Sequence, residues 1–193
     1  MTDLVIGGLS RWLPLDLEAD ADEYAARLAQ EYPRTRHAEL VASGVAGMAA
    51  RFRQAQQEAE AEGDSVLVAA WLFLRADDDL SPLAHATLQG LALPPGEETV
   101  EAVIERLLRE EDEVYQEPEV RDLTTESGPA TFLRYRPVDH SGAERVVHER
   151  SCVLWMRPDR GLVAILDAYT DDLMAGREVP EALAQLAEGV SGL

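Results

Sequence analysis

Apolar residues recur every three or four positions in the first third of the chain, which predicts a short helix followed by a long one. The short helix is ended by Pro33, since proline cannot continue a helix. The apolar positions are Tyr24, Leu28 and Tyr32 in the first helix and Val41, Val45, Met48, Phe52, Ala55 and Ala59 in the second. The second stripe is narrow on an otherwise polar helix, so it must pack against another element.

Two extended segments follow. Residues 65–74, SVLVAAWLFL, are continuously apolar, which predicts a strand buried on both faces. Residues 81–93 allow two interpretations. Ser81 and Pro82 could begin a helix, but Ala84, Ala86 and Leu88 alternate as in a strand, and we favour the strand.

The second half of the chain predicts a helix, further strands and a closing helix. An amphipathic helix over about 98–109 is marked by Val100, Val103, Ile104, Leu107 and Leu108. Strands are expected over 119–126, 130–138 and 143–157, joined by glycine-containing turns. The closing helix is marked by Val179, Leu183, Leu186 and Val190, with Pro180 in its first turn.

Residues 150–172 read as a hairpin that is apolar on both faces near its turn. If 158–161 form a four-residue loop, Arg157 lies opposite Leu162 and Cys152 opposite Asp167. One face is then uniformly apolar, with Val153, Trp155, Leu162, Ala164, Leu166 and Ala168. The other passes from Leu154, Met156, Val163 and Ile165 to His148, Arg150, Asp167, Tyr169 and Asp171. We expect the N-terminal helices, another subunit or a ligand to cover this second face.

The order of elements predicts an α+β fold with an antiparallel sheet of about six strands and flanking helices. We expect residues 1–64 to form an N-terminal helical segment packed on a main domain, an α/β sandwich over 65–193. From residue 65 onward this element order resembles that of the PsbP-like α/β/α sandwich proteins, known from a photosystem subunit and a nuclear-import accessory factor. The resemblance implies an accessory or binding role and transfers no site residue to this chain.

Charge and composition limit the classes of partner that the chain can bind. The 193 residues carry a formal net charge of −20, which repels phosphate backbones and anionic surfaces, so we expect neither a nucleic-acid nor a membrane partner. Arginine supplies all 17 basic residues, and both lysine and asparagine are absent, a bias that favours a high-GC bacterial source. The N-terminal stretch lacks the basic region and apolar run of a signal peptide, which predicts a cytoplasmic protein.

Candidate catalytic and metal-binding groups are few. Cys152 and His148 lie four residues apart on a strand, about 13 Å, too far for a hydrogen bond, so we interpret Cys152 as a buried structural residue. His37, His85 and His140, like His148, lack metal-ligand spacing, and the acidic triplet 77–79 lacks the pattern of a calcium loop. With no phosphate-binding loop either, we expect no cofactor, no metal and no catalytic residue.

Residues 97–119 hold ten acidic residues against two arginines, a local net charge of −8. Such a run forms a solvated face or a docking surface for a basic partner. We therefore predict a non-enzymatic cytoplasmic accessory or protein-binding module that uses a sheet face and an acidic surface to bind a protein partner or a second copy in a homodimer. The alternative is a small-molecule-binding protein or enzyme with a pocket between the sheet and the N-terminal helices, where Arg150, Asp167 and Tyr169 contact the ligand.

Overall fold

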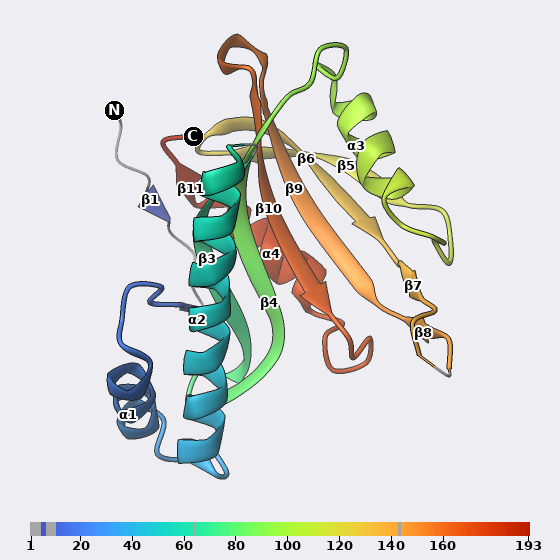
Figure 1. Ribbon diagram of the computed structural model, residues 1–193. Helices are drawn as coiled ribbons and strands as arrows, with labels where there is room; N and C mark the ends of the chain where they lie inside the picture. The colour runs from blue at the N-terminus through green and yellow to red at the C-terminus, as the bar shows by residue number, and fades with distance from the viewer. Residues whose placement is uncertain (1–4, 7–10, 64, 143) are drawn as a thin grey trace.

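A seven-stranded antiparallel sheet forms the centre of the computed structural model, which describes residues 5–6, 11–63, 65–142 and 144–193 (Figure 1). The strand order is β2-β3-β4-β10-β9-β6-β5. The strands are β2 (Trp12–Pro14), β3 (Ser65–Ala76), β4 (Asp79–Ala92), β5 (Glu119–Thr125), β6 (Gly128–Tyr135), β9 (Glu149–Arg157) and β10 (Leu162–Thr170). Two further pairs of short strands lie outside this sheet. β1 (Val5–Ile6) pairs with β11 (Val190–Ser191), and β7 (Val138–Asp139) pairs with β8 (Val146–Val147). The α+β class is confirmed, and the sheet is larger than the six strands expected.

The predicted helices are present within the described residues as α1 (Ala21–Glu31), α2 (Ala38–Glu62), α3 (Val100–Arg109) and α4 (Val179–Glu188). Local capping explains two of the starts. The Asp20 carboxylate accepts hydrogen bonds from the first backbone N–H groups of α1, and the Thr99 hydroxyl accepts one from Ala102. Figure 1 shows α2 passing over one face of the sheet along β3, and α3 at the opposite end of the sheet. Helix α4 lies behind the sheet in this view.

One face of the sheet, here called the α4 face, is apolar across its width. Side chains from β3, β4, β6, β9 and β10 pack there against α4. The main contributors are Trp71, Phe73, Ala86, Leu88, Phe132, Val153, Trp155, Ala164, Leu166 and Ala168 from the sheet and Val179, Leu183 and Leu186 from α4. The buried Trp155 indole donates a hydrogen bond of 2.9 Å to the Thr125 hydroxyl. The predicted apolar face of the hairpin is therefore confirmed, and α4 covers it.

The opposite face, here called the groove face, is covered by helices mainly at its two ends. Helices α1 and α2 pack on β3, bringing Leu28, Ala42, Val45, Ala46 and Ala49 against Ala70, Leu72 and Leu74. Helix α3 packs at the other end, bringing Val103 and Leu107 against Leu133, Tyr135, Leu154, Val163 and Ile165. The cover expected from the N-terminal helices, another subunit or a ligand was thus assigned wrongly: α3 buries the apolar half of this face.

Three further expectations need correction. The missed strand β2 pairs Trp12–Pro14 with β3, and a three-residue segment containing a proline is too short to show a period. The strand expected over 143–157, whose first residue lies outside the described residues, is interrupted, because the His148 N–H bonds to the Pro137 carbonyl and β9 starts only at Glu149. Val190 belongs to β11, because α4 ends at Glu188.

The N-terminal segment shares the sheet with the rest of the chain. It contributes β2 as an edge strand, and α1 and α2 supply much of the apolar cluster on β3. Among the described residues, no helix combines the length and apolar character needed to span a membrane.

Candidate functional site

The hairpin β9–β10 has the predicted register. Arg157 pairs with Leu162, Cys152 with Asp167 and Arg150 with Tyr169. The loop closes at Gly161, which adopts the left-handed backbone conformation that glycine accepts without a steric penalty (φ 63°). Because residues two apart on a strand share a face, Arg150, Asp167 and Tyr169 all lie on the groove face, as expected from the sequence.

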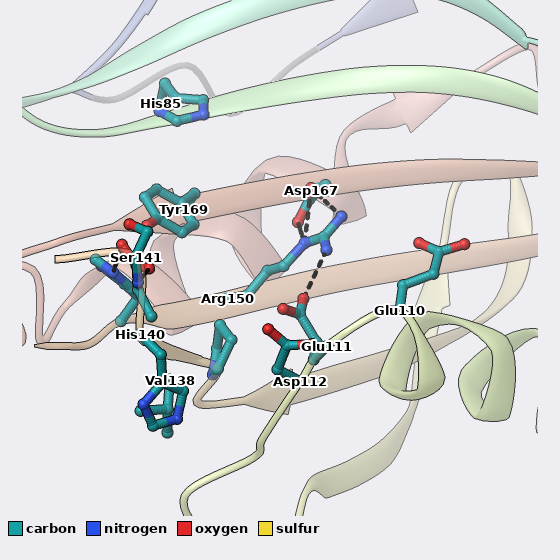
Figure 2. A pocket seen from close by; sticks show the side chains of 13 residues that line it. His85, Glu110, Glu111, Asp112, Val138, His140, Ser141, Arg150, Asp167 and Tyr169 are labelled. Atoms are coloured by element: carbon teal, nitrogen blue, oxygen red, sulfur yellow. Dashed lines mark hydrogen bonds and ion pairs between the residues drawn. The ribbon is translucent and has the colours of Figure 1, made fainter. Parts of the chain in front are cut away.

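Arg150 is the centre of a polar network on this face. Its Nε donates to both oxygens of Asp167 at 3.0 and 3.1 Å, and its terminal nitrogens lie 3.0 Å from Asp167 Oδ2 and 3.2 Å from Glu111 Oε1. Figure 2 shows the guanidinium between the two carboxylates, joined to both by dashed lines. Burial disfavours the charge on Arg150, but Asp167 outweighs this cost and raises the pKa of the guanidinium above its ordinary value. Each of the three guanidinium nitrogens therefore already contacts a carboxylate.

Two buried side chains extend this network beneath the surface. The Tyr135 hydroxyl donates to Glu111 Oε1 at 3.2 Å, and the Cys152 thiol donates to Asp167 Oδ1 at 3.2 Å. Burial raises the pKa of both groups, and for Cys152 the adjacent Asp167 carboxylate raises it further. Both groups keep their protons and hold the carboxylates in place, which agrees with the interpretation of Cys152 as a buried structural residue.

A row of aromatic rings crosses the groove face beside this network. Phe52 of α2, His85 of β4, Tyr169 of β10 and His148 follow one another, with centroid distances of 5.6, 5.6 and 5.2 Å. Burial lowers the pKa of His85, and burial together with the nearby Asp171 raises the pKa of Tyr169. At neutral pH, His85 is uncharged and Tyr169 keeps its hydroxyl proton.

Two hollows open beside these groups, one toward the segment after α3 and the other toward α3 itself. The first, called the polar cavity, has a volume of about 720 Å³ and is lined by the Arg150 network, part of the aromatic row and residues 110–112 and 137–141. The second, called the apolar cavity after its larger apolar part, has a volume of about 610 Å³. Its apolar lining residues are Leu91, Ala92, Leu93, Pro94, Leu107 and Ile165, and its polar ones are Ser65, Gln89, Arg106, Glu110, Arg150 and Asp167. Glu110, Arg150 and Asp167 line both cavities, so the two adjoin and form one groove.

The groove does not lie where the sequence suggested. A pocket was expected between the sheet and the N-terminal helices, whereas both cavities lie toward α3 and the segment after it. A smaller hollow of about 470 Å³ near His85 and Tyr169 reaches Met48 of α2. The reason is the path of the chain, because α2 covers β3 and leaves the centre of the sheet open.

The other sequence candidates have structural roles or are dispersed. Asp78 and Asp79 lie at the β3–β4 turn, where Asp78 pairs with Arg34 at 2.7 Å and Asp79 accepts hydrogen bonds from Ser81, as a polar turn requires. His85, His140 and His148 all line the polar cavity, but no group of three or more His, Cys, Asp or Glu within the described residues has the geometry of a metal site.

Two residues of the groove were not predicted as parts of one site. His85 lies on the groove face because Ala84, Ala86 and Leu88 face α4, and this alternation was visible in the sequence. Glu111 lies in an irregular segment after α3, where no period tells which way a side chain points. Only the tertiary structure brings it to Arg150.

Comparisons with known proteins found no matching protein-family model, curated protein or solved structure. The resemblance to PsbP-like proteins in element order stays a prediction.

Proposed function

We propose that this chain is a non-enzymatic ligand-binding protein and that the groove between the sheet and α3 is its binding site. The observation that carries the proposal is convergence: polar side chains from β4, β9, β10 and residues 110–112 line one 720 Å³ cavity that adjoins an apolar cavity. Concave sites that combine an apolar part with a few oriented polar groups are typical of small-molecule binding.

The rigidity of the polar lining supports this function. Arg150, Asp167 and Glu111 hold one another through several hydrogen bonds, and Tyr135 and Cys152 support them from below. A ligand therefore meets side chains that are already oriented, and less conformational entropy is lost on binding.

The chemistry of the groove and of the network beneath it favours binding over catalysis. The Cys152 thiol is fully buried and protonated, so it is not an available nucleophile. The Tyr169 hydroxyl also keeps its proton, because burial and Asp171 raise its pKa. The Tyr169 hydroxyl suits hydrogen bonding to a ligand, whereas the Cys152 thiol bonds only within the network.

The function preferred from the sequence, a module that binds a protein partner or a second copy, stays a prediction. One argument for it, an uncovered apolar sheet face, no longer applies, since Leu154, Val163 and Ile165 are buried under α3. A cytoplasmic location belongs to the proposal on the sequence argument alone.

A fragment screen by saturation-transfer NMR tests the proposed function. We expect hits that Tyr169→Ala weakens at least fivefold, whereas Tyr115→Ala, at an exposed tyrosine outside both cavities, leaves them unchanged. A second variant, Ser141→Trp, fills the polar cavity from an exposed loop position and should abolish the same hits without disturbing the core. If no fragment responds to either groove variant, the proposal is wrong.

A further inference from the structure

The polar cavity has more negative than positive charge in its lining. Its five carboxylates belong to Glu110, Glu111, Asp112, Asp139 and Asp167. Among the described residues that line it, Arg150 supplies the one guanidinium, and three histidines and Tyr169 are the other titratable groups. Even with all three histidines protonated, five negative charges would face four positive ones. The lining is therefore net negative near neutral pH.

The charge of the single guanidinium is already balanced by protein carboxylates. Every nitrogen of Arg150 contacts Asp167 or Glu111 at 3.0–3.2 Å. A phosphate or carboxylate that binds the remaining N–H groups would lie close to the carboxylates of Asp167 and Glu111, which already hold the guanidinium. The negative charges of the ligand and of these carboxylates would repel each other strongly in a half-buried site.

Carboxylate oxygens, in contrast, remain open to a ligand. Both hydrogen bonds that Glu111 accepts end at Oε1, so Oε2 accepts none from the described residues. Glu110 and Asp112 form no ion pair with a described basic residue. The half-buried Glu111 side chain, 22% exposed, can thus contact a cation without losing its structural bonds.

The adjoining apolar cavity indicates that the other end of the ligand is apolar. Leu91, Leu93, Leu107 and Ile165 line it, and Arg106 at its rim is already paired with Glu97 at 2.9 Å. A methylene chain or aryl group placed there would be removed from water, which is favourable in proportion to the apolar area buried.

We propose that the ligand is an amphiphilic organic cation, whose ammonium or amidine group lies at Glu111 and Asp112 and whose apolar part occupies the cavity under α3. This assignment rests on the proposed function and specifies its ligand class. It excludes free anions, which meet net negative charge, and small polar cations, which leave the apolar cavity empty.

Four matched probes test this assignment: octylamine, octan-1-ol, octanoate and ethylamine. Binding is measured by isothermal titration calorimetry at physiological ionic strength, and the binding site is located by backbone amide shifts near His85, Glu111 and Tyr169. We expect octylamine to bind at least tenfold more tightly than each of the other three. The alcohol and the acid test the charge, and ethylamine tests the apolar cavity.

Variants separate specific binding from general attraction to an acidic protein. The double variant Glu111→Gln/Asp112→Asn should weaken octylamine binding at least tenfold. Glu117→Gln, an exposed carboxylate of the same segment that lies outside both cavities, should change it less than twofold. Asp112→Asn alone, at an exposed side chain with no described ion-pair partner, gives a partial loss and guards against misfolding of the double variant.

The outcomes distinguish the two proposals. Equal or tighter binding of octan-1-ol or octanoate in the groove would overturn the cationic class and leave ligand binding by the groove intact. Octylamine binding that Glu117→Gln weakens as much as the double variant, or no binding of octylamine, also overturns the assignment. The proposed function itself fails only if the broad fragment screen finds no ligand whose binding is weakened by either Tyr169→Ala or Ser141→Trp.

Discussion

The two faces of the sheet are formed by the same strands but have opposite properties at their centres. On the α4 face, Ala86, Leu166 and Val153 lie under a central helix, and the apolar core extends across the sheet. On the groove face, their strand neighbours are Thr87, Asp167 and Cys152, and the helices lie at the two ends. The position of a covering helix thus decides whether the centre of a sheet can hold polar groups.

The largest expected effect on stability is that of a substitution on the α4 face. Leu183→Ala removes a fully buried side chain of α4 and should lower the free energy of unfolding by about 3 to 5 kcal/mol, because the surrounding core relaxes only partially. Urea denaturation followed by circular dichroism measures the change. Leu40→Ala, at a 74% exposed leucine of α2, should change stability by less than about 0.5 kcal/mol. Similar losses for the two variants would contradict the packing of α4.

At the polar centre of the groove face, Arg150→Met should cost about 2 to 4 kcal/mol, since Asp167 is left half-buried without its cation. The double variant Arg150→Met/Asp167→Leu should lose less than the sum of the single variants, with a coupling energy of about 1 to 3 kcal/mol. Urea unfolding of all four proteins at pH 7 measures this cycle. Additive losses would mean that the two groups contribute independently.

A smaller loss is expected under α3. Leu107→Ala should cost about 2 to 3 kcal/mol, less than Leu183→Ala, because Leu107 borders the apolar cavity and water reaches the space that it leaves. Glu105→Ala, on the exposed side of the same helix, serves as the control. A loss below about 0.5 kcal/mol for Leu107→Ala in denaturant unfolding would contradict the position of α3.

The smallest effect concerns the pH dependence of the groove face. Burial lowers the pKa of His85 in the folded protein, and the charges of Asp167, Asp171 and Arg150 also act on it. As pH falls below about 6.5, the unfolded chain binds a proton that the folded protein resists, so the folded protein is destabilised until the pH reaches the lowered pKa.

The variant His85→Phe keeps an aromatic ring beside Phe52 and Tyr169 and should remove this sensitivity. Between pH 7 and pH 5 it should lose on the order of 1 kcal/mol less stability than the wild type. Unfolding free energies at the two pH values give the comparison. An identical pH dependence of wild type and His85→Phe would refute the buried neutral state.

Local patterns predicted the parts of the fold that local chemistry determines. The four-residue loop ending at Gly161 determined the register of β9 and β10, and with it the common face of Arg150, Asp167 and Tyr169. The apolar stripe of α3 predicted that helix, though not the strands that it covers, because its position depends on how the chain returns across the sheet. The same limit applies to Glu111 and to β2, whose side chains are positioned by partners far away in sequence.

The pairing of β4 with β10 at the middle of the sheet has a consequence for how the protein folds. The hairpins β3–β4 and β9–β10 are local, whereas Ala92 meets Leu162 only after the intervening chain has closed into a long loop. Closing such a loop carries an entropic cost and slows folding, so we expect the two hairpins to form before they join. His85 belongs to the first hairpin, and Arg150 and Tyr169 to the second. The groove is therefore assembled at the junction of two folding units, and a ligand that bridges them would report that the late step of folding is complete.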